Sequence, residues 1–247
     1  MVRFAVLSDL HANLVALEAV LCDIQAQGAP DIYWVLGDLV SHGAWPSETI
    51  ARLRALPNVF FIQGNADRYV STGRRPHIPV RSCRDWARMP AMLAISDANF
   101  RWTVERLSYA DFEFLRDLPT QLGADIPGYG RIVAVHAAPG DDEIELSPDM
   151  TEKRVRRYLD DLDARLLLFG HTHQPADWTV DCTRLVNVGS VGLPLDGDPR
   201  AAYARIDFKD GTCELALRRV PYDIEAVVDE LERRQFPAWA QIASTMR

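Results

Sequence analysis

Five short apolar runs in this sequence each end at, or within two residues of, a Gly, Asp, Asn or His residue. The runs cover residues 2–7, 31–36, 58–62, 131–136 and 164–169. Apolar runs without polar alternation are typical of strands buried on both faces, as in parallel sheets. Apolar residues at helical spacing fill 12–27, between the first two runs, and 46–56, between the next two, is also expected to be helical. Alternating strands and helices predict parallel β-α-β units and therefore an α/β fold.

The later part of the chain is expected to mix helices with shorter strands. Residues 68–90 are rich in Arg and Pro and have no clear period, and helices are expected at 97–107, 109–118, 148–161 and 222–233. Four strand-like runs are found at 177–181, 184–188, 203–208 and 212–217, the last two joined by an Asp-Gly turn. Because no repeat or low-complexity linker interrupts the pattern, a single domain over residues 1–247 is expected.

Composition and charge exclude several classes of protein. A chain that is 48% hydrophobic and 25% charged is neither disordered nor collagen-like, and no apolar run approaches the roughly 18 residues of a membrane span. The net charge of −8 argues against nucleic acid and anionic lipid as partners. Cys22, Cys83, Cys182 and Cys213 show no C-x-x-C spacing, which favours core packing in a reducing compartment. We therefore expect a cytoplasmic protein without a membrane partner.

Side chains able to bind metals gather where the predicted buried strands end. They are Asp9, His11, Asp38, Asn65, His136, His171 and His173. The carboxyl ends of strands in an open α/β sheet are where ligands bind. Imidazoles and carboxylates without thiolates suit Mn, Fe, Zn, Ni or Co. Seven ligands exceed the three or four of a mononuclear site, so a carboxylate shared between two divalent ions is predicted, an arrangement that clamps phosphoryl groups.

Each of these pieces has an ordinary explanation when it is taken alone. An Asp after a strand usually caps a helix or turn, and Gly-Asn is most often a turn. A single histidine such as His136 is commonly a hydrogen-bonded core residue. Order, spacing and placement together favour the metal centre.

The successive motifs D-x-H, G-D, G-N-x-D, a single His and G-H-x-H resemble the calcineurin-like metallophosphoesterase family. The similarity covers most of the chain, from DLHAN at Asp9 through GDLVSHG, GNADRYVSTG and GHTH to NVGSVGLPLDGDPRAAY at Asn187. The chain is similar in particular to the small bacterial and archaeal phosphoesterases of this family. The resemblance implies two mixed β-sheets packed face to face with helices on the outside, a four-layer αββα sandwich, and hydrolysis of phosphate mono- or diesters.

The resemblance also implies a role for each matching residue. For the first ion the ligands would be Asp9, His11 and His173, and for the second Asn65, His136 and His171. Asp38 would bridge the two ions, for which manganese is a candidate. A hydroxide between them would attack phosphorus in line with the leaving oxygen, so Asp38 and Asn65 are counted as catalytic.

The sequence departs from the family pattern at two points. Many members have a histidine where this chain has Ala66, and that histidine is the usual candidate for contacting the phosphate and protonating the leaving group. Without it, good leaving groups should react best. Ser41 replaces a more usual acidic or small residue, and His42 follows it. His42 is a candidate replacement acid, and the alternative is that it only packs or faces water.

The motifs assign no role to several other conspicuous residues. An arginine-rich stretch follows Asn65 and contains Arg68, Arg74, Arg75, Arg81, Arg84 and Arg88. It is either a solvated surface or a cover over the metals that guides phosphate groups. Trp34, Trp86, Trp102 and Trp178 are expected in the core, and His77 is assigned no role.

The sequence therefore predicts a metal-dependent phosphoesterase acting on a small phosphate ester. A phosphodiesterase is favoured over a phosphomonoesterase or protein phosphatase. The alternative from a different class is a non-catalytic metal-binding scaffold with this fold. Ala66 favours the scaffold, whereas seven unsubstituted ligand positions favour the enzyme. The substrate, the metals and the oligomeric state stay open.

Overall fold

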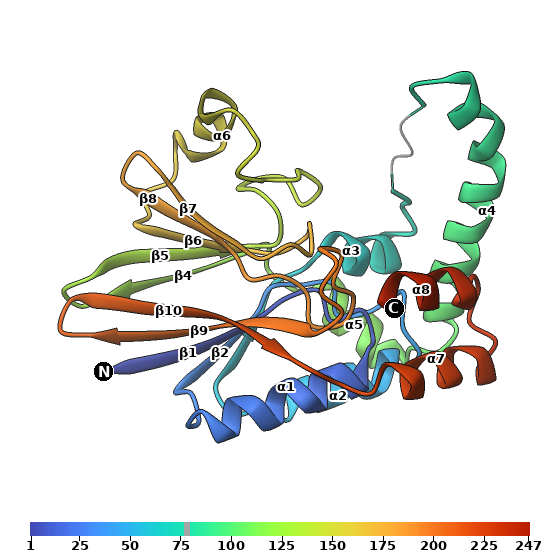
Figure 1. Ribbon diagram of the computed structural model, residues 1–247, viewed down its shortest axis with the longest axis horizontal. Helices are drawn as coiled ribbons and strands as arrows, with labels where there is room; N and C mark the ends of the chain where they lie inside the picture. Colours follow the sequence, from blue (N-terminus) through green and yellow to red (C-terminus); the bar gives the residue numbers. More distant parts are fainter. Residues whose placement is uncertain (77–79) are drawn as a thin grey trace.

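The computed structural model describes residues 1–76 and 80–247, so His77 lies outside the described residues. Two five-stranded mixed sheets pack face to face (Figure 1). The first has the order β10-β9-β1-β2-β3, with parallel pairing among β1, β2 and β3 and antiparallel pairing at β9 and β10. Its strands are β1 (Val2–Leu7), β2 (Ile32–Val35), β3 (Val59–Phe61), β9 (Ala201–Lys209) and β10 (Thr212–Val220).

The second sheet has the order β4-β5-β6-β8-β7, in which β5, β6 and β8 run parallel and both edge strands are antiparallel to their neighbours. Its strands are β4 (Gln121–Ile126), β5 (Gly130–Val135), β6 (Leu166–Phe169), β7 (Ala176–Val180) and β8 (Thr183–Asn187). Both sheets are thus mixed, which confirms the predicted sandwich of two mixed sheets.

Helices cover the outer faces of the two sheets and one end of the molecule (Figure 1). Over the first sheet lie α1 (Leu14–Ala26) and α2 (Pro46–Arg54), and α6 (Glu152–Leu159) lies over the second. At the end of the sandwich are α3 (Asn65–Thr72), α4 (Cys83–Val104), α5 (Tyr109–Arg116), α7 (Ile224–Arg233) and α8 (Trp239–Met246).

The core between the sheets is made of strand residues that face inward. Phe4, Val6 and Trp34 from the first sheet belong to the same buried cluster as Leu166 and Leu168 from the second. Full burial of a side chain of this size stabilises the folded chain by about 1.5–3 kcal/mol relative to leaving it exposed. Since alternate residues of β1, such as Ala5 and Leu7, instead pack in the α1 and α2 cluster, the strand is apolar on both faces, as its sequence predicts.

Several elements differ from the sequence-based expectation. The helix expected at 97–107 is only the end of α4, which begins at Cys83 and contains Pro90. The first half of α4 projects away from the sheets (Figure 1), and its buried residues all lie between Asn99 and Thr103. A half-helix with no core contact shows no apolar period, so the sequence did not reveal that the helix begins at Cys83. The strand β4 and the helices α3 and α8 were also not predicted.

Two expectations about burial were wrong. Trp86 lies on the projecting half of α4 and is 65% exposed, although Trp34 and Trp102 are buried as expected. Three of the four free cysteines, Cys22, Cys83 and Cys182, are exposed and do not pack in the core, whereas the half-buried Cys213 packs against the cluster between the sheets. Within the described residues, no helix is both long enough and apolar enough to cross a membrane.

Candidate metal centre

The seven predicted ligands lie together where strands of both sheets end. Asp9 and His11 follow β1, Asp38 follows β2, and Asn65 follows β3, all in the first sheet. The second sheet supplies the residues after β5 and β6, which are His136, His171 and His173. These strand ends meet beside α3 (Figure 1). The carboxyl ends of the parallel strands therefore form the rim that the sequence predicted.

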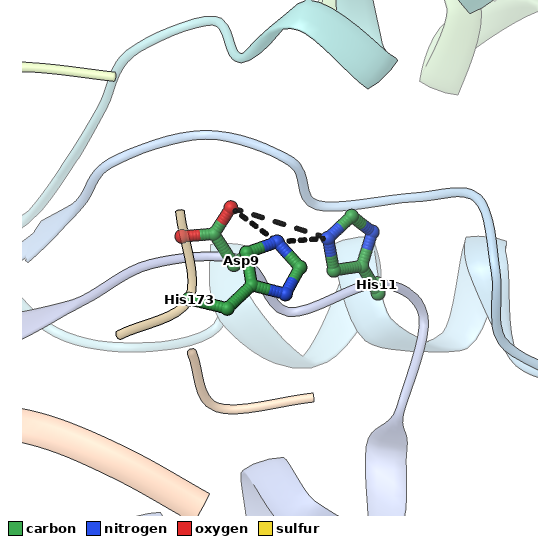
Figure 2. Close-up of side chains that lie close together, drawn as sticks. All are labelled: Asp9, His11 and His173. Atoms are coloured by element: carbon green, nitrogen blue, oxygen red, sulfur yellow. Dashed lines mark hydrogen bonds and ion pairs between the residues drawn. The ribbon is translucent and has the colours of Figure 1, made fainter. Parts of the chain in front are cut away.

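The first group of donors contains Asp9, His11 and His173 (Figure 2). The Nε2 atoms of the two imidazoles are 3.1 Å apart, and Asp9 Oδ1 is 3.2 Å from His173 Nε2 and 3.9 Å from His11 Nε2. All three side chains are buried. Three nitrogen and oxygen donors thus point at one small volume, as the ligands of a single ion do.

Asp38 lies between this group and a second one. Its Oδ2 is 3.7 Å from His11 Nε2, and its Oδ1 is 3.5 Å from His136 Nε2. Asp9, Asp38 and His136 form a further set of donors whose ligand atoms converge. The two carboxylate oxygens of Asp38 therefore face different histidines, which is the geometry expected of a bridging ligand.

Asn65 and His171 extend the second group. Asn65 Oδ1 is 2.8 Å from His136 Nε2 and 3.0 Å from His171 Nδ1. The backbone amide of His171 donates to Asp9 Oδ2 at 3.0 Å, which connects the loop after β6 to the end of β1. The structure thus brings all seven predicted residues together.

The tautomers of two histidines suit metal binding. The Nδ1 atom of His136 contacts the carbonyl oxygen of Leu36 at 2.7 Å, and that of His173 contacts the carbonyl oxygen of Leu193 at 2.5 Å. A carbonyl only accepts, so Nδ1 carries a proton, and Nε2 is the nitrogen whose lone pair can bind a metal once the ring is neutral. That lone pair faces carboxylate or amide oxygens, and Asp9 Oδ1 is a buried oxygen without a hydrogen-bond partner. Facing acceptors need a cation between them, so the residues fit divalent metal ions.

Burial and mutual charge perturb the acids and bases of the centre. Burial alone would lower the pKa of His173, but the Asp9 carboxylate raises it. Asp38 affects His136 in the same way, so the pKa of His136 is also raised. Burial and the charge of Asp9 raise the pKa of Asp38 to about 6. Burial and the neighbouring His136 lower the pKa of His171 to about 4. Perturbed pKa values of this kind cluster at functional sites.

The backbone around the centre is strained. Most of the non-glycine residues with a positive φ among those described lie here, with φ from 45° to 73°: Asp9, His11, Ala12, Asp38, Ser41, His42, His171 and His173. A left-handed conformation costs a non-glycine residue about 1–3 kcal/mol, and such strain is found at functional sites. The strain turns successive loops so that their side chains converge.

Two glycines allow the strand ends to approach one another. A Cβ on Gly64 would collide with the backbone amide and Oδ1 of Asp38, and one on Gly170 would collide with Ser8 and Asp9 Oδ2. Any side chain at Gly64 or Gly170 would therefore push apart the loops that carry the ligands.

Sequence reasoning missed the residues that support the ligands. Asp67 is buried and accepts hydrogen bonds from the backbone amides of Leu39 and Gly64, at 2.9 and 3.0 Å, which holds the loop after Asp38 against α3. Burial and the charge of Asp38 raise the pKa of Asp67 to about 7. Ser190 Oγ donates to the carbonyl of Asp9 at 2.8 Å. The G-N-x-D and N-V-G-S patterns were the available signals, since both place small hydrogen-bonding side chains beside ligands.

His42 lies next to the first donor group. Its ring is edge-on to that of His11, with centroids 5.2 Å apart. Its Nδ1 contacts Ser41 Oγ at 3.1 Å, and its backbone amide donates to Asn99 Oδ1 at 3.3 Å. Burial and the nearby His173 lower the pKa of His42 to about 4. His42 is thus a neutral ring at neutral pH, fixed beside the centre.

A polar cavity of about 710 Å³ adjoins the second donor group at His136. Arg68 and Arg74 line it, with Asp142 and Glu143 opposite. The guanidinium of Arg68 pairs with Asp142 at 2.6 Å and with Glu143 at 2.6 Å, so its charge is compensated. Of the arginine-rich stretch, Arg74 and Arg68 therefore approach the centre.

The other members of the stretch lie elsewhere. Arg75 pairs with Asp97 at 2.8 Å, and Arg81, Arg84 and Arg88 are exposed on or just before the projecting half of α4. The stretch is thus partly a solvated surface and partly a wall of the cavity.

Known proteins resemble this chain in both sequence and structure. The sequence profile of the calcineurin-like phosphoesterase family matches residues 2–175. An uncharacterised protein of Methanocaldococcus jannaschii is 32% identical over 252 residues, which cover 95% of this chain and 94% of that protein. A metallophosphoesterase from Sphaerobacter thermophilus is similar in structure with a TM-score of 0.75 and 27% identity, over 99% of this chain and 98% of that one. A hypothetical protein from Pyrococcus horikoshii has a TM-score of 0.81 at 24% identity, over 100% of this chain and 98% of that one, and supports the fold.

Proposed function

Because this chain belongs to the calcineurin-like phosphoesterase family, we propose that it is a metal-dependent hydrolase of phosphate esters with a dinuclear centre, acting best on diesters. The position of Asp38 is the observation that supports this most. Its two oxygens face His11 and His136, at 3.7 and 3.5 Å, so that one carboxylate serves both donor groups. In this proposal Asp9, His11 and His173 hold one divalent ion and Asn65, His136 and His171 the other.

Two divalent ions in such a site would polarise a phosphoryl group and lower the pKa of a water molecule for attack. The chain's own residues would fix the geometry. The carbonyls of Leu36 and Leu193 hold two histidines in the tautomer that presents Nε2. Ala66 donates its backbone amide to Asp38 Oδ1 at 2.8 Å, which orients the bridging carboxylate. Because these groups are buried and already placed, little reorganisation is needed during the reaction.

The surroundings of the centre support a diester substrate. The polar cavity opens beside His136, and a second pocket of about 380 Å³ opens at His42, on the side of the other donor group. A diester carries two arms that need room on either side of the phosphorus, whereas a monoester carries one. His136 lines one recess, and His42, which lies beside His11, lines the other, so the two recesses suit a diester better.

We assign His42 a role in positioning rather than in proton donation. Its ring lies beside His11 and its pKa is lowered to about 4, so the imidazole is neutral near pH 7. A neutral imidazole is a weak source of protons, but its ring nitrogen can donate a hydrogen bond. Because position 66 is an alanine and not a histidine, esters with good leaving groups should therefore be the better substrates.

Metal content and turnover together test this function. The chain loaded with Mn²⁺ should contain two ions by elemental analysis and should hydrolyse bis(p-nitrophenyl) phosphate faster than p-nitrophenyl phosphate, in terms of kcat/KM. The chelated protein is the control and should be inactive. Two bound ions without turnover of either ester would make the chain a metal-binding scaffold. Faster turnover of the monoester would make it a phosphomonoesterase.

A further inference from the structure

The pocket at His42 differs in chemistry from the cavity on the other side of the centre. It lies between α4, α8 and the segment that contains Leu193 and Leu195. Met92, Ile95, Leu193, Leu195 and Ile242 form its apolar walls. The described residues that line it include no Asp, Glu, Lys or Arg, whereas the cavity at His136 contains Arg68, Arg74 and three acidic residues. A pocket without charged groups suits an uncharged ligand group.

Direct contacts join this pocket to the proposed metal ligands. His42 lines the pocket, and its ring is 5.2 Å from that of His11, centroid to centroid. Leu193 also lines the pocket, and its carbonyl accepts from His173 Nδ1 at 2.5 Å. A phosphate group held by the first donor group would therefore have the pocket next to it.

The size and the polar groups of the pocket indicate the kind of group it takes. Its volume of about 380 Å³ is within the range of small-molecule sites, which is about 300–1,000 Å³. Ser96 and Gln241 add hydrogen-bonding side chains to the apolar walls. Apolar walls with a few polar groups are typical of sites for flat aromatic groups, whose faces need apolar contact and whose edges carry polar atoms.

We propose that this pocket binds an uncharged aromatic arm of the phosphate ester and makes the centre selective for esters that carry one. This inference rests on the proposed function, because the phosphate must occupy the adjacent metal centre. Phenylphosphonate and methylphosphonate are suitable probes, since both carry the anionic group, differ only in the arm and contain a carbon–phosphorus bond that is not hydrolysed.

Calorimetric titration of the Mn²⁺-loaded protein measures the preference without requiring turnover. Phenylphosphonate should bind about 10-fold more tightly than methylphosphonate, which corresponds to ~1.4 kcal/mol. Ile95→Trp places a large ring on one wall of the pocket and should reduce that ratio to about 2 or less. Leu195→Trp, on another wall, should do the same, and it guards against a local defect in α4.

Leu93→Trp is the matched control. Leu93 is on the same helix and is 43% exposed, against 44% for Ile95 and 45% for Leu195, but it does not line the pocket. The control should keep the 10-fold ratio. Equal binding of the two phosphonates to the unmodified protein, or equal effects of Ile95→Trp and Leu93→Trp, would overturn the pocket assignment even if ester hydrolysis is found. Failure of both phosphonates to bind would overturn the metal centre and this inference with it.

Discussion

Replacing Asp38 with Asn removes the charge of the carboxylate proposed to bridge the two ions and keeps its shape. The Oδ1 atom can still accept from the Ala66 amide, so the local fold should survive. Because the two oxygens of Asp38 face His11 and His136, both ions should bind more weakly. A close pair of unit charges near a protein surface interacts by ~4 kcal/mol. We therefore expect each ion to lose about 100-fold or more in affinity, since tenfold corresponds to ~1.4 kcal/mol.

The consequence for thermal stability can be worked out. At an ion concentration of 100 times Kd, each ion stabilises the folded chain by ~2.7 kcal/mol. Two ions give ~5 kcal/mol, and at ~2–4 °C per kcal/mol for a chain of this size the melting temperature should rise by ~10–20 °C. If Kd increases 100-fold, the same ion concentration equals Kd and leaves only ~0.4 kcal/mol for each ion. Mn²⁺ should then raise the melting temperature of Asp38→Asn by at most ~3 °C.

The order of stability should reverse when a chelator is present. Burial and the charge of Asp9 raise the pKa of Asp38, so the ionised carboxylate destabilises the metal-free protein at neutral pH. The amide removes that cost, and the variant should melt at or above the temperature of the chelated unmodified protein. Differential scanning calorimetry with and without Mn²⁺, together with elemental analysis, measures both effects.

Two controls make this result specific. Asp117→Asn removes an exposed carboxylate that pairs with Arg116, and it should leave the metal-induced rise intact. His171→Ala removes an imidazole whose ring is within hydrogen-bond distance of only one other ligand side chain, that of Asn65. This variant should lose one ion and keep the other. Retention of two ions by Asp38→Asn would refute the bridging role, and the loss of one ion only would make Asp38 a ligand of a single site.

Three further outcomes are expected. His42→Ala should slow aryl and alkyl diesters by similar factors, measured as kcat/KM, because its lowered pKa leaves the ring neutral; a loss of about 10²-fold confined to alkyl esters would show it to be the general acid. Gly64→Ala should lose bound metal because its Cβ collides with a ligand, whereas Gly123→Ala, at a position without positive φ and with ordinary contacts of 3.4 Å or more, should keep the metal; equal metal content would contradict this. Burial alone would raise the pKa of Asp23, but the hydrogen bonds from Arg218 and Tyr203 and the charge of Arg218 together lower it below 3.8. The ionised carboxylate therefore adds stability that is present above that pH and is lost as the pH falls through the lowered pKa. The melting temperature of Asp23→Asn should accordingly fall less steeply between about pH 5 and pH 2 than that of the unmodified protein, and identical slopes would count against the ion pair.

The sequence predicted the ligand-bearing half of the fold because buried strands leave a strong signal. Val2–Leu7 is apolar on both faces since one face packs on helices and the other on the second sheet. Its end at Asp9 was therefore clear. The strand Gln121–Ile126 was missed because it alternates between exposed and half-buried residues at a sheet edge and contains Gly and Asp.

The residues near the centre that were missed or misjudged depend on contacts that spacing does not reveal. Asp67 was part of a recognised motif, but its bonds to the amides of Leu39 and Gly64 exist only when two loops are folded together. Trp86 was expected in the core because tryptophan usually is, yet the helix that carries it extends away from the sheets. Local pattern identifies donor residues well, and it does not show which distant segments surround them.

The donors of the proposed centre come from loops of both sheets, with Asp9, His11, Asp38 and Asn65 on one side and His136, His171 and His173 on the other. Ions held there would cross-link segments that are far apart in the chain. Since all four cysteines are free, such a cross-link would not depend on the oxidation of thiols to disulfides. The complete donor set forms only after the two sheets have docked. Interactions that are absent from the folding transition state slow unfolding and leave the folding rate nearly unchanged. Bound ions would therefore slow the unfolding of the chain more than they change its rate of folding.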